Sequence, residues 1–155
     1  MTELIFNLAN LAVLPFWGAM IFLPNWRGTR WLLRSLIPLA LLALVYLYFF
    51  ILSTLSLSPE NLEALASAQL GDLARAFSDE TVMATGWTHY LVMDLFVGRW
   101  IYWQGQEKGI WVFHSLALCL FAGPLGLLSH LITVALAERL GNRAPTTVTD
   151  GAPAP

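Results

Sequence analysis

Apolar residues occupy four long stretches of this chain, and short polar segments separate one stretch from the next. The stretches cover residues 4–23, 31–56, 80–103 and 109–137. A helix needs about 20 residues to cross the hydrocarbon core of a bilayer, and each stretch reaches that length. The pattern therefore predicts an all-α membrane protein with four transmembrane helices. The last stretch is longer than a span requires, so we expect it to tilt, to kink at Pro124 or to protrude.

The segment between the second and third stretches, residues 59–77, has a different pattern. Its apolar residues recur at helical spacing, whereas its acidic residues lie largely elsewhere on the helical wheel. This is typical of an amphipathic helix that is too charged to span a bilayer. Because an acidic helix is not attracted to anionic lipid, we expect it to cap the helical bundle, with a break at Gly71. Ser78, Asp79 and Glu80 then offer caps for the third span.

Charged residues between the spans predict how the chain is oriented. Arg27, Arg30 and Arg34 cluster in and beside the first short connection. By the positive-inside rule this connection is cytoplasmic, which places the N-terminus on the non-cytoplasmic side. We expect residues 1–141 to form a single multi-pass domain in a bacterial inner or thylakoid-type membrane. Residues 142–155 are rich in Pro, Ala, Thr and Gly and are expected to be a disordered tail.

The composition argues against several classes of protein. Of the 155 residues, 57% are hydrophobic and 12% are charged, whereas soluble domains carry about 25% charged residues. The net charge of −2 gives no electrostatic basis for a nucleic-acid partner. Cys119 is the one cysteine of the sequence, so we expect neither an intramolecular disulfide nor a cysteine metal site.

The third stretch contains three ionisable side chains close together, those of His89, Asp94 and Arg99. An ionisable group in hydrocarbon costs about 2.5–3.5 kcal/mol by insertion scales, so these residues must face other helices, water or a ligand. At 100° per residue, His89 and Arg99 lie about 140° from Asp94 on opposite sides. The three side chains therefore do not form one cluster on a straight helix.

Asp94 is too deep in the span to reach water easily, so it is either functional or part of a buried structural pair. Trp87 and Tyr90 share its face of the helix, with Tyr102 nearby, and all three are candidate substrate-binding residues. Arg99 lies one turn from the predicted cytoplasmic end. It either stabilises charge on a substrate or anchors the helix by extending to the interface.

Small residues recur along the fourth stretch at spacings of four and three, in the stripe Ser115, Cys119, Ala122, Gly126, Ser129 and Thr133. Such stripes usually bring membrane helices close together. If the third and fourth helices pack antiparallel, Cys119 comes level with Asp94, which makes Cys119 a further candidate in the substrate site. On that alignment His130 lies about 10 Å beyond His89. The three histidines, His114 included, then cannot share an ion, and no metal site is predicted.

His89, Asp94, His114 and His130 are separate groups that are capable of acid–base chemistry. The sequence has no Glu-x-x-His pair, no haem-attachment motif and no glycine-rich phosphate loop to accompany them. Proton transfer is the chemistry that such side chains perform unaided. We therefore expect no cofactor, and an enzyme of this kind would take an apolar substrate from the bilayer.

Motifs in both halves of the chain resemble those of one known family. They are Val13-Leu14-Pro15-Phe16, Trp87-x-His89-x-Leu91-x-x-Asp94-Leu95-Phe96-x-x-Arg99-x-x-Tyr102, His114-Ser115, Leu118-Cys119-Leu120, Pro124-x-Gly126 and Ser129-His130-x-Ile132-Thr133. Over residues 12–135 the sequence is similar to the abscisic-acid-deficient-four family, the neoxanthin-synthase-like membrane proteins of plastids and their bacterial relatives. It looks like a bacterial-type member. The chain has Gln104-Gly105 where the family pattern has Asp-Gly.

The resemblance implies a role in carotenoid metabolism, since plastid members are needed to form neoxanthin from violaxanthin. That conversion isomerises an epoxide to an allenic alcohol, and it requires an acid and a base but no net redox change. Asp94 and His89 are the first candidates for these roles. His114 and His130 are the second, while Arg99 stabilises charge or anchors the helix.

Two alternatives remain open beside this interpretation. The first is a cis–trans isomerase that acts on the same class of polyene. The second is a non-catalytic protein that binds pigment or lipid, or that assembles with another membrane protein through the stripe of small residues. The expected partners are accordingly a carotenoid or other isoprenoid lipid, membrane lipid and a membrane protein.

Overall fold

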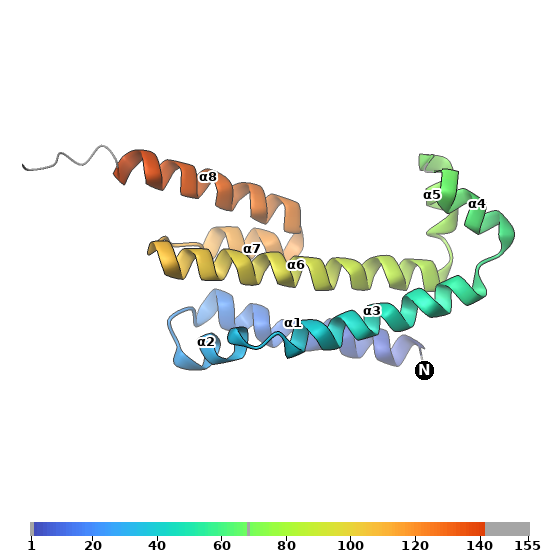
Figure 1. Cartoon of the computed structure of the whole chain (residues 1–155), viewed down its shortest axis with the longest axis horizontal. Coiled ribbons are helices and arrows are strands. Elements are labelled where there is room, and N and C mark those ends of the chain that lie inside the picture. The colour runs from blue at the N-terminus through green and yellow to red at the C-terminus, as the bar shows by residue number, and fades with distance from the viewer. Residues whose placement is uncertain (1, 68, 142–155) are drawn as a thin grey trace, which may run out of the picture.

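A computed structural model describes residues 2–67 and 69–141, and this part of the chain is entirely helical, without strands (Figure 1). The predicted tail at 142–155 lies outside the described residues. The helices in order are α1 Thr2–Phe22, α2 Arg27–Arg34, α3 Ile37–Ser56, α4 Pro59–Ser67, α5 Leu70–Ala76, α6 Glu80–Lys108, α7 Phe113–Phe121 and α8 Gly123–Gly141.

Three long helices, α1, α3 and α6, run side by side along the molecule (Figure 1). Of the helices described, α1 and α3 are long and apolar enough to cross a membrane, judged by length and composition. The prediction of four such helices therefore holds for two. Leucines on the outer faces of α1 and α3, such as Leu11 and Leu44, are exposed, while Met20 and Phe49 are fully buried.

The second predicted span, residues 31–56, is not one helix. It is divided between the end of α2 and the whole of α3, and the chain bends at Ser35 and Leu36. Pro38 lies in the first turn of α3. Backbone N–H groups in the first turn of a helix have no partner within the helix, so the N–H that proline lacks is not needed there. α2 consequently forms a separate short helix at one end of the molecule (Figure 1).

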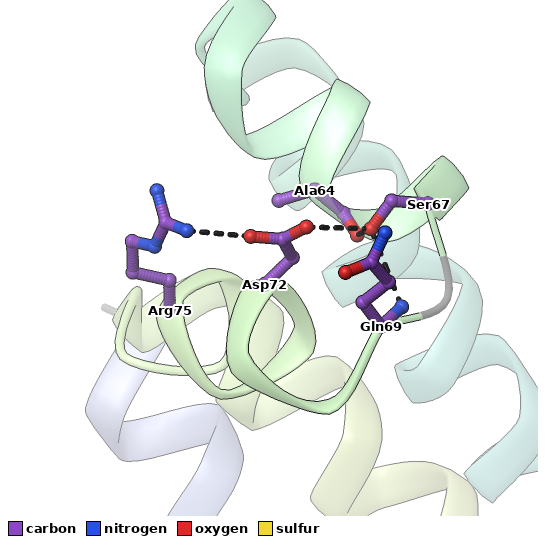
Figure 2. A network of polar contacts seen from close by, with 5 residues as sticks. All are labelled: Ala64, Ser67, Gln69, Asp72 and Arg75. Carbon is purple, nitrogen blue, oxygen red and sulfur yellow. Dashed lines mark hydrogen bonds and ion pairs between the residues drawn. The ribbon is translucent and has the colours of Figure 1, made fainter.

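The predicted amphipathic helix at 59–77 is also divided, into α4 and α5, which pack against each other at the opposite end of the molecule (Figure 1). The break falls between Ser67 and Leu70 rather than at Gly71. Figure 2 shows the reason: the Ser67 hydroxyl accepts from the N–H of Gln69 and donates to the Asp72 carboxylate at 2.9 Å. Asp72 also pairs with Arg75 at 2.5 Å.

α6 is longer than predicted, because residues 104–108 continue the helix instead of forming a loop. At its start, Asp79 caps the helix as expected: Oδ1 accepts from the N–H groups of Thr81 at 2.9 Å and Val82 at 3.2 Å. At its end, Gly109 takes a left-handed conformation with φ of 64°, which a glycine adopts without steric cost.

The fourth predicted span is wrong as a single helix, because the chain reverses at Ala122. α7 and α8 form an antiparallel hairpin, in which the Ser115 and Ser129 hydroxyls lie 3.0 Å apart. Pro124 lacks the N–H needed to continue α7 beyond the turn. Gly126 packs directly on Cys119, where any side chain at 126 would overlap. The stripe of small residues thus joins the two arms of one hairpin.

The hairpin extends only part of the way along α6 (Figure 1). With nine residues, α7 is about 14 Å long, half of what a bilayer crossing needs. α8 then runs parallel to α6, from the level of Asp94 to the contact of Lys108 with Glu138 at 2.6 Å. The C-terminal end of α8 therefore lies at the same end of the molecule as α2 (Figure 1).

Candidate functional site

A cavity of about 490 Å³ lies between α1, α6 and the reversal between α7 and α8. Most of its wall is apolar. Its lining consists of Asn10, Leu11, Val13, Leu14 and Trp17 from α1, Trp87, Tyr90, Leu91 and Asp94 from α6, and Leu120, Phe121, Ala122, Gly123 and Pro124 from the hairpin. Among these residues Asp94 is the one with an acidic side chain, and none is basic.

The Asp94 carboxylate faces the N-terminus of α8. The backbone N–H of Gly123, the first residue of α8, donates a hydrogen bond to it. Gly123 has no room for a side chain, because a Cβ there would overlap Asp94 Oδ1. A helix N-terminus presents unpaired N–H groups and a partial positive charge, and both favour an anion at this position. The structure thus shows how this charge is accommodated in the middle of α6.

On the α1 side of the cavity, the polar side chains of Asn10 and Trp87 are hydrogen-bonded. Trp87 Nε1 donates to Asn10 Oδ1 at 2.8 Å, and Asn10 Nδ2 donates to the carbonyl of Phe6 at 2.8 Å. Tyr90 is 59% exposed at the rim, and its hydroxyl has no hydrogen-bond partner among the described residues. The site therefore combines one carboxylate and one free phenol with aromatic walls.

His89 lies on the other side of α6 from this cavity. Its ring is 5.8 Å from that of Tyr46 on α3, and it lines a second cavity of about 300 Å³ between α3 and α6. Thr85 and Ser53 meet beside it, with 3.3 Å between their hydroxyl oxygens. The wheel prediction that His89 and Asp94 point in different directions agrees with this arrangement.

The other two predicted histidines form contacts between helices. His114 Nε2 lies 2.9 Å from Thr133 Oγ1, and His130 Nε2 lies 3.0 Å from Gln104 Oε1. His130 is fully buried. The expectation that His130 lies beyond the level of His89 is wrong, because the reversal returns α8 alongside the second half of α6. Neither histidine reaches the cavity at Asp94.

The remaining predicted residues support neighbouring backbone. Arg99 Nε donates to the carbonyl of Leu33 at 2.7 Å, and the Tyr102 hydroxyl donates to the carbonyl of Pro24 at 2.7 Å. Cys119 is buried, and its thiol lies 3.6 Å from the Asp94 carbonyl. Within the described residues, no group of three His, Cys, Asp or Glu side chains is placed to hold a metal ion.

Sequence reasoning thus placed Asp94, Trp87 and Tyr90 in one site, and the structure brings these three together. It did not include Asn10 or Gly123 in the site, because it expected residues 109–137 to form one long helix, at most kinked at Pro124. A polar residue inside an apolar span was the available signal for Asn10. The Gly-Pro pair was the available signal for the turn.

The fold and the cavity define an all-helical protein with bilayer-length helices and a carboxylate held at the turn of a helical hairpin. The chain belongs to the ABA DEFICIENT 4-like family, whose sequence profile matches residues 4–130, a region that contains all of the cavity lining. It is 36% identical over 137 residues to Protein ABA DEFICIENT 4, chloroplastic, of Arabidopsis thaliana. That alignment covers 85% of this chain and 61% of the relative, so the chain spans about three fifths of the relative's length. No solved structure matches the chain significantly.

Proposed function

We propose that this protein acts in carotenoid or xanthophyll metabolism as an acid–base isomerase, with the site at Asp94. The observation that carries the proposal is the lone carboxylate in an aromatic, otherwise apolar cavity within the region that matches the family. A polyene with an oxygenated ring end has complementary chemistry, since its chain needs apolar contact and its ring needs one or two polar groups. The ring end enters the cavity, and the chain lies along the outer surface of the helices.

In this proposal Asp94 is the base. Its carboxylate removes a proton from the carbon beside the ring, while the ring C–O bond of the epoxide opens and its oxygen takes up a proton. Tyr90, at the rim of the cavity, gives its hydroxyl proton to that oxygen, and the proton taken up by Asp94 returns to Tyr90 through solvent. One proton leaves carbon and one reaches oxygen, so the product is an isomer and no redox cofactor is required. The N–H of Gly123 positions the carboxylate for this step.

We further propose that the protein spans the membrane with three helices, α1, α3 and α6, and that the α7–α8 hairpin enters and returns. α8 supports this arrangement, because its outward residues Leu128, Leu131 and Ile132 are exposed while His130 faces inward and is buried. A helix with apolar residues on its outer face and a polar residue on its inner face is expected to contact lipid rather than water. α6, with 29 residues, is long enough to cross a bilayer, although it is less apolar than α1 and α3.

The distribution of charge supports an orientation with the N-terminus on the non-cytoplasmic side. The C-terminal ends of α6 and α8 lie at the end of the molecule that carries α2 (Figure 1). These segments carry the basic residues Arg27, Arg30, Arg34, Arg99, Lys108 and Arg139, together with Glu107 and Glu138. The N-terminal end of α1 and the start of α6 lie at the opposite end, with α4 and α5 (Figure 1). These segments carry Glu3, Glu60, Glu63, Asp72, Asp79 and Glu80, together with Arg75. The α7–α8 hairpin increases the difference in positive charge between the two ends, because it brings Arg139, in the last turn of α8, to the end that carries α2. By the positive-inside rule that side is cytoplasmic.

A non-catalytic pigment-binding protein is the second candidate. It is favoured by the contact of Asp94 with Gly123, which gives the carboxylate a structural partner that is independent of any substrate. Purification in mild detergent, an absorption spectrum and incubation with candidate xanthophylls distinguish the two. Isomerised product, resolved by chromatography, supports the enzyme. Bound pigment that is recovered unchanged with every xanthophyll tested supports the binding protein and contradicts the enzyme.

A further inference from the structure

α2 is an amphipathic helix with its charged face turned outward. Thr29 and Leu33 are buried against the rest of the molecule at 0% and 2% exposure. Arg27, Arg30 and Arg34 are three and four residues apart and therefore lie on one exposed face. Trp31 lies on the same face, 77% exposed, beside a hollow of about 480 Å³ that these residues line.

The three guanidinium groups have no acidic partner in the described part of the chain. The ion pairs found there are Arg75–Asp72 and Lys108–Glu138, and neither involves α2. From residue 4 to residue 59 the sequence contains no aspartate or glutamate. Arg30 makes polar contacts with the carbonyl of Asn25, 3.5 Å from its Nη2, and with the Tyr102 hydroxyl, and neither partner is acidic. Three cations therefore stand together without internal compensation.

Three contacts hold this face in a fixed position. Arg99 Nε donates to the Leu33 carbonyl in the last turn of α2. A positive charge at this position also interacts favourably with the negative C-terminal end of the helix dipole. The Thr29 hydroxyl donates to the Leu23 carbonyl at 2.7 Å, and Tyr102 bonds to the carbonyl of Pro24. A connection that served only to carry positive charge would not need such fixation, whereas a binding site benefits from a preorganised surface.

We propose that the face formed by Arg27, Arg30, Trp31 and Arg34 is a binding site for the phosphate of an anionic membrane lipid. Guanidinium groups bind phosphate through paired N–H donors, and a cluster of them suits one phosphate with its several oxygens. An exposed tryptophan is typical of the level where lipid headgroups meet the hydrocarbon core. The position of α2, at the end of the bilayer-length helices, places the site at that level. It is separate from the cavity at Asp94.

The test measures lipid binding to the purified full-length protein by native mass spectrometry. Dioleoyl phosphatidylglycerol and dioleoyl phosphatidylcholine are titrated separately, so that only the headgroup differs. We expect tighter binding of phosphatidylglycerol by tenfold or more, and a loss of about fivefold in its affinity for each arginine replaced by glutamine. Equal binding of the two lipids by the wild-type protein would overturn the proposal.

The variants separate the site from general charge and from folding. Arg27→Gln with Arg34→Gln leaves Arg30 in place and is expected to lose the preference for phosphatidylglycerol while it keeps the wild-type melting temperature in detergent alone. Arg75→Gln, at the other end of the molecule, is the matched control and should keep the preference. A double variant that retains full preference refutes the site. Stabilisation by inorganic phosphate equal to that by phosphatidylglycerol would assign the face to a soluble anion instead.

Discussion

Gly123→Ala is the most informative test of the turn that holds Asp94. The added methyl group would occupy the position of Asp94 Oδ1, so either the carboxylate or the start of α8 must move. Overpacking of this kind costs about 1–3 kcal/mol. Loss of the hydrogen bond from the Gly123 N–H to the charged carboxylate costs about 1.5–3 kcal/mol. The two costs arise from the same displacement, so we expect a loss of about 3 kcal/mol in unfolding free energy.

The assay is chemical denaturation in detergent, followed by circular dichroism. Asp94→Ala removes the group that the methyl would meet. The cost of Gly123→Ala should therefore fall by about 1–3 kcal/mol in that background, as expected for residues in contact. Gly18→Ala is the matched control: a Cβ there meets nothing within 4 Å, so the change should be neutral or stabilising. If Gly123→Ala costs the same with and without Asp94, the reasoning about the turn is refuted.

Four further predictions concern the helix cap, α2 and the hairpin. Asp79→Ala should lower stability by about 1 kcal/mol through loss of the α6 cap, measured by thermal melting. Hydrogen bonds from the Thr81 hydroxyl and the Val82 N–H lower the pKa of Asp79, so its charge stabilises the fold above the unfolded pKa of about 3.9. That contribution is lost as the pH falls through the lowered native pKa. The melting temperatures of the wild type and Asp79→Asn should therefore converge in acid, and a constant difference would contradict this. Arg99→Met should raise amide hydrogen exchange in α2 about tenfold or more, because the last turn loses a charged hydrogen bond; unchanged exchange would show that α2 is held without it. Gly126→Ala should destabilise the hairpin by about 1–3 kcal/mol because its Cβ would overlap Cys119, whereas Gly71→Ala, which faces open space, should not. Equal effects of these two changes would contradict the close packing of the hairpin.

The elements that depend on local signals were predictable from the sequence. α1 follows its apolar run closely, and the Asp79 cap lies where a capping residue precedes a helical pattern. The grouping of Asp94 with Trp87 and Tyr90, and its separation from His89, also followed from the sequence, because positions on one helix are fixed by the 100° rotation per residue.

The elements that depend on contacts between helices were not predictable. An apolar run from 109 to 137 has the same hydropathy as a single span and as a hairpin, so the reversal at Ala122 was missed. Two errors followed from that one. His130 was placed beyond His89 instead of beside Gln104, and Gly123 was not recognised as the partner of Asp94. Arg99 had two open roles, charge stabilisation and anchoring of its own helix at the interface, and neither anticipated its hydrogen bond to the carbonyl of Leu33 on α2.

We propose that Asp94 performs chemistry in addition to capping α8, and Asp94→Asn separates these two roles. Asparagine has the same shape, and its carbonyl oxygen still accepts from the Gly123 N–H, but it does not act as a base at neutral pH. The measurement is turnover of a xanthophyll by the purified variant, with bound pigment and melting temperature recorded on the same sample. We predict wild-type folding and pigment binding with no isomerised product. Product formation by Asp94→Asn at the wild-type rate would contradict the account.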